Sequence, residues 1–92
     1  MNFSWDPKKE AANRGKHKVS FTEAVTAFYD PMAKVTGDPD HSKGEERFIL
    51  IGHTHQRNLL FVVHVYRESD EHIRIISARK ATAKERRDFE EL

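Results

Sequence analysis

The chain has 92 residues, and its 16 Lys and Arg side chains nearly balance 15 Asp and Glu side chains, for a net charge of +1. A chain of this length has a modest core, so we expect residues 1–92 to form one domain. The near-neutral total excludes a protein that is polycationic overall. Bases nevertheless gather near both ends of the sequence, which leaves room for a local basic surface.

Cysteine is absent, which excludes disulfide bonds, thiolate metal sites and a cysteine nucleophile. No apolar run approaches the roughly 20 residues of a membrane span, and the N-terminal segment is too polar and charged for a signal peptide. The sequence therefore predicts a cytoplasmic protein that has no contact with a membrane.

The sequence begins with a predicted edge strand and a predicted helix. Residues 2–5 place two aromatic side chains on one side of an extended segment. Asp6 before Pro7 is a typical helix start, because the carboxylate caps free amides and the ring fixes the first helical torsion. Gly15 is a typical C-terminal cap, so we expect the first helix to run from Pro7 to about Arg14.

Two capping boxes predict two further helices. Ser20 and Glu23 have the required spacing, and the helix that they begin must end before Pro31. Thr82 and Glu85 have the same spacing and predict a last helix that reaches residue 92 and is weakly anchored.

Between these helices the sequence predicts strands. A short strand is expected at Met32 to Thr36, and longer ones at Glu46 to Gly52, Leu59 to Tyr66 and Glu71 to Ala81. The short connections favour antiparallel neighbours, because a parallel pair needs a long crossover. The order of elements predicts an α+β protein, with two N-terminal helices on one face of an antiparallel sheet and a short C-terminal helix.

Matching like residues across the strands predicts a register. We expect Leu50 opposite Val62, Phe48 opposite His64, and His64 opposite Arg74. One face is then almost wholly apolar and is expected to lie under the two N-terminal helices. It carries Ile49, Ile51, Leu59, Phe61, Val63, Val65, Ile73 and Ile75.

The opposite face combines apolar and ionisable side chains and is a candidate ligand surface. An equally simple interpretation is that it is the wet face of a one-sided antiparallel sheet. Its polar members are Glu46, His64, Tyr66, His72, Arg74 and Lys80.

Four residues of this face suggest chemistry. Arg74 can clamp a phosphate and stabilise its developing charge, although a surface ion pair is the simpler role. His64 and Glu46 can transfer protons near neutral pH, although a packed or exposed histidine is common. Tyr66 can stack on a base, and cross-strand packing explains it equally well.

Two histidine and aspartate groups resemble metal ligands only loosely. His53 and His55 form one group, and Asp38, Asp40 and His41 form the other, but neither has three ligands at a diagnostic spacing. We therefore expect no metal and no cofactor.

Three segments in the right order resemble the BrnT family of type II toxin–antitoxin toxins: Trp5 to Ala24, Asp38 to Gly52 and Arg74 to Glu91. The resemblance implies a RelE-like ribonuclease fold and an RNA-cleaving activity that inhibits translation. It also implies a BrnA-type antitoxin that neutralises the toxin. That antitoxin is expected to supply any contact with DNA.

The resemblance implies site residues in the RIISARKA motif, namely Arg74, Arg79 and Lys80, although the predicted register puts Arg79 on the covered face. We expect metal-independent cleavage, in which a base activates the ribose 2′-hydroxyl, Arg74 and Lys80 stabilise the phosphorane-like charge, and an acid protonates the leaving 5′-oxygen. Substrate contacts are expected from Tyr66, His72 and Lys84. The alternatives are a catalytically inactive RNA-binding module and a co-repressor that acts only within the antitoxin complex.

Overall fold

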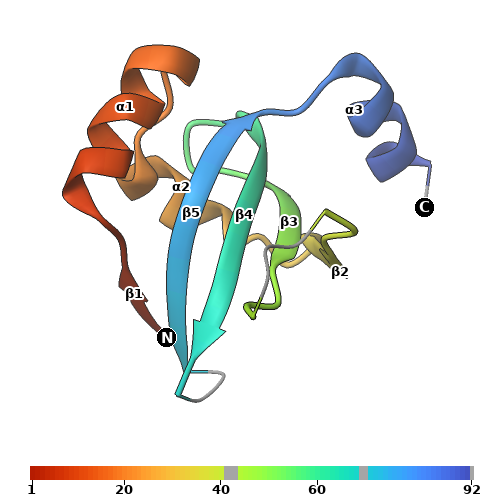
Figure 1. The fold of residues 1–92 in the computed structure, drawn as a ribbon. Helices are drawn as coiled ribbons and strands as arrows, with labels where there is room; N and C mark the ends of the chain where they lie inside the picture. Colours follow the sequence, from red (N-terminus) through yellow and green to blue (C-terminus); the bar gives the residue numbers. More distant parts are fainter. Residues whose placement is uncertain (41–43, 69–70, 92) are drawn as a thin grey trace.

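The computed structural model describes residues 1–40, 44–68 and 71–91. It consists of one five-stranded sheet and three helices, which confirms the predicted α+β class (Figure 1). The strand order in the sheet is β1-β5-β4-β3-β2. The elements are β1 (Asn2–Ser4), α1 (Pro7–His17), α2 (Phe21–Ala27), β2 (Lys34–Gly37), β3 (Phe48–His53), β4 (Leu59–Arg67), β5 (His72–Lys80) and α3 (Ala83–Glu90).

The sheet is mixed rather than antiparallel. β1 pairs with β5 in parallel, with Phe3 beside Ile73 and Ser4 beside Arg74, whereas β2, β3, β4 and β5 are joined by antiparallel pairs. The prediction of a wholly antiparallel sheet is therefore wrong at this edge. The long stretch of chain between β1 and β5 removes the constraint that short connections impose on the other strands.

The first helix is longer than predicted. α1 continues past Gly15 to His17, and its cap is Lys18, which has φ 60° and donates its amide hydrogen to the carbonyl of Arg14 at 2.9 Å. The prediction that Gly15 ends the helix is wrong, since a single glycine inside a helix costs only about 1 kcal/mol. The predicted last helix ends at Glu90; residue 92 lies outside the described part of the chain.

The capping residues behave as predicted at α3 and in part at α2. Thr82 and Glu85 form both halves of a capping box. Ser20 accepts the amide hydrogen of Glu23 at 3.0 Å. The carboxylate of Glu23, however, accepts hydrogen bonds from Thr54 and Asn58. It thereby ties α2 to the β3–β4 turn.

The predicted register is confirmed between β3 and β4, where Leu50 faces Val62, but it is wrong between β4 and β5. His64 faces Ile75 instead of Arg74. The register shifts between Val63 and His64, so that Ile76 is the extra residue of a β-bulge. Side chains of β5 from His72 to Ile75 consequently point to the face opposite to the one that simple alternation from Ser77 predicts.

The core lies under α2 and the end of α1. Its buried members from the helical region and the sheet are Val19, Phe21, Ala24, Ala27, Leu50, Leu60, Val62, Ile75 and Ala78. The even-numbered positions of β3 and β4 therefore face the helices. The prediction had placed the odd-numbered positions there, because both faces of these strands are apolar and alternation does not decide between them.

The other side of the sheet is called the outer face below. α3 covers part of it and lies across the sheet from α1 and α2 (Figure 1). A small hollow of about 220 Å³ remains between α3 and the strands β2 and β3. From the strand pairing, the outer face carries Ile49, Ile51, Phe61, Val63, Arg67, His72, Arg74, Ser77 and Arg79.

Candidate functional site

Four polar residues meet on the outer face where β1 joins β5. The hydroxyl oxygen of Ser4 lies 2.8 Å from Nε2 of His72 and 3.4 Å from Nη1 of Arg74. Arg67 lies opposite His72 in the β4–β5 pair. These four residues, the Ser4 cluster, line a hollow of about 270 Å³ together with Glu68. The cluster brings a hydroxyl, an imidazole and two guanidinium groups to one point of the surface.

The Ser4 cluster has the chemistry of an anion site. Arg67 is held by Glu45 at 2.9 Å, whereas Ser4 at 3.4 Å is the hydrogen-bond partner of Arg74 within the described part of the chain. A guanidinium group has five donors in a planar fork that matches phosphate, so Arg74 keeps donors for a ligand. His72 is half-buried beside it and can exchange a proton with a bound group.

His64 does not join this cluster. Its side chain is fully buried on the helix side of the sheet, with its ring edge-on to Phe28 at 4.9 Å. Nδ1 lies 3.2 Å from the carbonyl of Val62, and Nε2 lies 3.4 Å from the hydroxyl of Tyr66. Burial lowers the pKa of His64 below its ordinary value. The prediction that His64 shares an exposed face with Arg74 is wrong, because the core-facing side of β4 includes His64.

Tyr66 and Glu46 lie near each other beside a second hollow, which shares Arg67 and Glu68 with the hollow of the Ser4 cluster. Tyr66 faces Ile73 across the pair, and its ring lies 5.2 Å from the ring of Phe48. Glu46 is exposed and precedes β3, which begins at Phe48 rather than at the predicted Glu46. Both residues line a hollow of about 480 Å³ at the end of β4. The predicted face that joins them to Arg74 is not formed.

Arg79 lies at the far end of the outer face and holds α3. Its guanidinium group forms two hydrogen bonds of 2.9 Å with the carboxylate of Glu85 and lies 3.9 Å above the ring of Phe61. Hydrogen bonding to Glu85 raises the pKa of Arg79. Arg79 shares a face with Phe61, as the predicted register implies, but the N-terminal helices cover the other face, so the prediction that Arg79 is covered by them was wrong. The bulge brings Arg74 onto the same face as Arg79. A phosphate at this position would compete with Glu85.

Lys80 and Lys84 are surface cations outside the Ser4 cluster. Lys80 is exposed and pairs with Leu60, which places it on the opposite side of β5 from Arg74. Six residues of strand separate the two cations by about 20 Å. The prediction that Arg74 and Lys80 share a face is wrong, and one phosphate cannot contact both. Lys84 lies 3.0 Å from Asp88 in an exposed ion pair.

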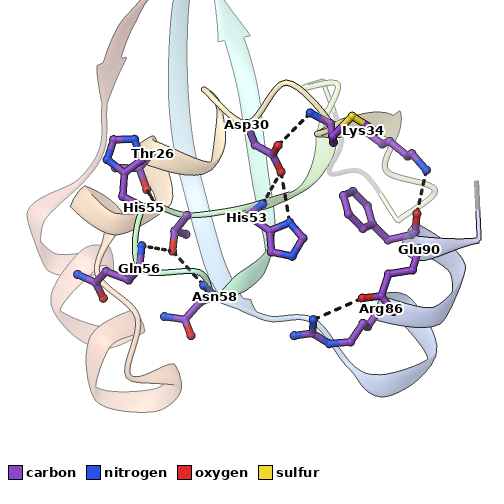
Figure 2. Close-up of polar contacts among 12 residues, drawn as sticks. Thr26, Asp30, Lys34, His53, His55, Gln56, Asn58, Arg86 and Glu90 are labelled. Atoms are coloured by element: carbon purple, nitrogen blue, oxygen red, sulfur yellow. Dashed lines mark hydrogen bonds and ion pairs between the residues drawn. The ribbon is translucent and has the colours of Figure 1, made fainter.

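A second polar region connects the end of α2 to β3 and α3 (Figure 2). Asp30 accepts the amide hydrogen of His53 at 2.7 Å, and the His53 ring lies 5.6 Å from that of Phe89. Lys34 donates to the carbonyl of Phe89 at 3.0 Å. Burial alone would raise the pKa of Asp30, but hydrogen bonds from the amides of His53 and Met32 outweigh it and lower the pKa. These contacts are structural links.

Within residues 1–40, 44–68 and 71–91, no group of three His, Asp or Glu side chains could hold a metal ion; the predicted loose ligand His41 lies outside these ranges. The described helices include none that is long and apolar enough to cross a membrane.

Sequence reasoning missed Ser4 and Arg67. Their importance depends on the β1–β5 pairing and on the true β4–β5 register. The alternation of Phe3, Ser4 and Trp5 was a usable signal, because it implies that a hydroxyl points away from the aromatic side of β1.

Comparison with known proteins covers most of the chain. Residues 5–85 match a family described as the ribonuclease toxin BrnT of type II toxin–antitoxin systems. The structure resembles the 1.1 Å crystal structure of the Brucella abortus ribonuclease toxin BrnT, with a TM-score of 0.66 and 25% sequence identity. The match covers 89% of this chain and 97% of the Brucella chain. No curated protein matches the sequence.

Proposed function

Because this chain belongs to the BrnT family of ribonuclease toxins of type II toxin–antitoxin systems, we propose that it is a metal-independent endoribonuclease whose site is the Ser4 cluster. The observation that carries this proposal is the pairing of His72 and Arg74 around one hydroxyl on the outer face. A cation and a titratable group at one point are the minimum for cleaving a phosphodiester without help from another group.

The proposed reaction uses the RNA's own nucleophile. A base removes the proton of a ribose 2′-hydroxyl, and the resulting oxygen attacks the adjacent phosphorus. The bond to the 5′-oxygen breaks, an acid protonates that leaving group, and the upstream product ends in a 2′,3′-cyclic phosphate. Arg74 stabilises the charge on the phosphorane-like transition state, and His72 takes part in proton transfer.

The remaining predicted residues fit secondary roles. Arg79 lies on the same face as Arg74 and about 16 Å along β5 from it, so we propose that it and Lys84 contact neighbouring phosphates of a bound strand, in competition with Glu85 for Arg79. Lys80 lies on the opposite face and has no proposed contact with that strand. Tyr66 and Glu46 lie beside a different hollow. We propose contact with a flanking nucleotide for these two and no proton transfer. His64 is sealed in the core and has no proposed catalytic step.

The test is to incubate the purified chain, freed of any partner and held in EDTA, with end-labelled RNA and a DNA of the same sequence. Discrete RNA cuts with 2′,3′-cyclic phosphate ends are expected, and the DNA should stay intact because it lacks the nucleophile. Arg74→Ala should lower the cleavage rate by about a hundredfold or more. Lys9→Ala removes an exposed cation of α1 and is the matched control. Cleavage that survives in Arg74→Ala would refute this site.

A second candidate function is RNA binding without cleavage, either alone or within a co-repressor complex. The burial of His64 favours it, because one of the two proton-transfer candidates expected from the sequence is absent from the outer face. RNA binding that weakens steeply with salt, without any product from the folded wild-type chain, would support this alternative.

We also propose that the toxin acts in the cytoplasm, inhibits translation, and is neutralised by a BrnA-type antitoxin that supplies the contact with DNA. α3 is a candidate docking element, because it has no buried residue among those described and is held through Glu85 and Phe89. Removing residues 82–92 should weaken antitoxin binding much more than it lowers the stability of the sheet. Equal losses in the free energy of antitoxin binding and in the free energy of unfolding in urea would contradict this.

A further inference from the structure

We propose that Ser4 is a positioning residue of this site, which fixes the tautomer of His72 and the direction of Arg74. This inference rests on the proposed function, since it assigns the Ser4 hydroxyl a role in RNA cleavage. Ser4 itself need not contact the reacting atoms. It acts by joining the two side chains that do.

The chemistry of the three groups fixes the direction of the hydrogen bonds. A guanidinium group only donates, so Ser4 Oγ accepts from Nη1 of Arg74 at 3.4 Å. The hydroxyl proton is then best used by donating to Nε2 of His72, at 2.8 Å. The hydrogen bonds from Arg74 to Ser4 and from Ser4 to His72 use one acceptor position and the donor of the hydroxyl. Linked hydrogen bonds of this kind strengthen each other.

This arrangement specifies one state of His72. A ring nitrogen that accepts a hydrogen bond carries no proton, so the neutral ring holds its proton on Nδ1. His72 is then fixed in orientation, and its neutral ring donates a hydrogen bond from Nδ1–H to a bound RNA. When both ring nitrogens carry protons, Nδ1–H is the proton that His72 gives to the leaving oxygen, and Ser4 then accepts from Nε2–H. Without the hydroxyl, both tautomers and several ring orientations become accessible.

β1 is built to hold this hydroxyl still. Phe3 packs edge-on against Phe28 at 5.1 Å, and Trp5 packs against Phe21 at 5.8 Å. The two aromatic side chains point into the core on either side of Ser4, which must therefore point to the outer face. Parallel pairing with β5 sets Ser4 directly beside Arg74. The position of the hydroxyl is thus determined by the backbone and by both of its neighbours.

The first measurement is nitrogen NMR of the His72 ring in the full chain without RNA, assigned with a His72→Gln variant. The Nδ1–H tautomer is expected in the wild type and in Ser4→Thr, which keeps the hydroxyl. In Ser4→Ala a substantial Nε2–H population is expected. Thr22→Ala, on the exposed side of α2, is the matched control. An unchanged His72 tautomer in Ser4→Ala would overturn the inference.

The second measurement separates chemistry from binding. In single-turnover RNA cleavage, Ser4→Ala should slow the step by about tenfold or more, and Ser4→Thr should restore most of the rate. Affinity for a 2′-O-methyl RNA, which cannot be cleaved, should change by less than about threefold. A cleavage rate for Ser4→Ala that equals the wild-type rate would also overturn the inference. An inactive wild-type chain would refute the proposed function, and the tautomer measurement would then decide the Ser4 inference alone.

Discussion

Arg79 of β5 and Glu85 of α3 form a bidentate ion pair, in which each terminal guanidinium nitrogen lies 2.9 Å from a different carboxylate oxygen. One of these oxygens also accepts the amide hydrogen of Thr82 at 2.9 Å and so completes the capping box of α3. Glu85 therefore begins the helix and attaches it to the sheet. Hydrogen bonding from Arg79 lowers the pKa of Glu85, with the amide of Thr82 as a smaller contribution.

Replacing Glu85 should loosen α3 without unfolding the sheet. Glu85→Ala removes the ion pair and half of the capping box, which is worth about 1 kcal/mol. Amide hydrogen exchange in α3 should therefore become about fivefold faster, while exchange in β4 stays unchanged. Glu90→Gln, which affects only the exposed and longer contact with Arg86, is the control. Exchange in α3 that does not change in Glu85→Ala would contradict the anchoring role.

Asn13 is the polar link between α1 and β5, and its replacement should lower the free energy of unfolding by more than Glu85→Ala does. Its side chain is 8% exposed, donates to the carbonyls of Val19 and Ala78, and accepts the amide hydrogen of Ala78. Asn13→Ala leaves these backbone groups buried and unpaired, so the free energy of unfolding should fall by about 2–4 kcal/mol. Urea unfolding measures this change. Asn2→Ala, at an exposed position, should have little effect, and a loss below about 1 kcal/mol for Asn13→Ala would refute the role.

Local patterns in the sequence predicted the elements better than their faces. The capping residues Ser20 and Thr82 marked true helix starts, because a cap depends only on neighbours in the chain. The apolar run Leu59–Val65 predicted a strand but not its orientation, since it is apolar on both sides. The bulge at Ile76 then inverted the faces of half of β5. Nothing in the sequence around Ile76 distinguishes a bulge from regular alternation.

The candidate site shows the same limit. Arg74 and His72 were predictable, because charged side chains at alternate positions of a strand mark an exposed face. The direction of the Ser4 side chain was predictable from its aromatic neighbours, but its role was not, because that role depends on a pairing with a strand 70 residues later in the chain. His64 was misplaced, since an imidazole packed between aromatic rings looks the same in sequence as an exposed one. Contacts between distant segments decide the cases of Ser4 and His64.

His64 should make stability depend on pH. Burial lowers its pKa from the ordinary value of 6.5, so below about pH 6.5 the unfolded chain binds a proton that the folded chain resists. The contribution of neutral His64 to the free energy of unfolding is therefore fully present above pH 6.5. It falls as the pH drops, by at most about 1.4 kcal/mol per pH unit. Urea unfolding from pH 7.5 to 5 should show this slope. The slope should be smaller in His64→Leu and unchanged in His55→Gln; equal slopes in all three proteins would contradict the assignment.

Replacing Gly52 or Gly15 with alanine should change the free energy of unfolding in opposite directions. A Cβ atom on Gly52 would lie 2.9 Å from Cβ of Ala33 and 3.0 Å from the carbonyl oxygen of Ala27, because the end of α2 crosses closely over β3. Gly52→Ala should therefore lower the free energy of unfolding by about 1–3 kcal/mol. Gly15 lies inside α1 with open space around it, so Gly15→Ala should raise that free energy by up to about 1 kcal/mol.

Both glycine variants can be measured by urea unfolding, and their double variant tests independence. The two sites share none of the close contacts found at Gly52, so their effects should add within about 0.5 kcal/mol. A Gly52→Ala protein as stable as the wild type would mean that α2 can move away from β3 at no cost. That result would contradict the tight packing at Ala27 and Ala33, through which the helix is fixed on the inner side of the sheet.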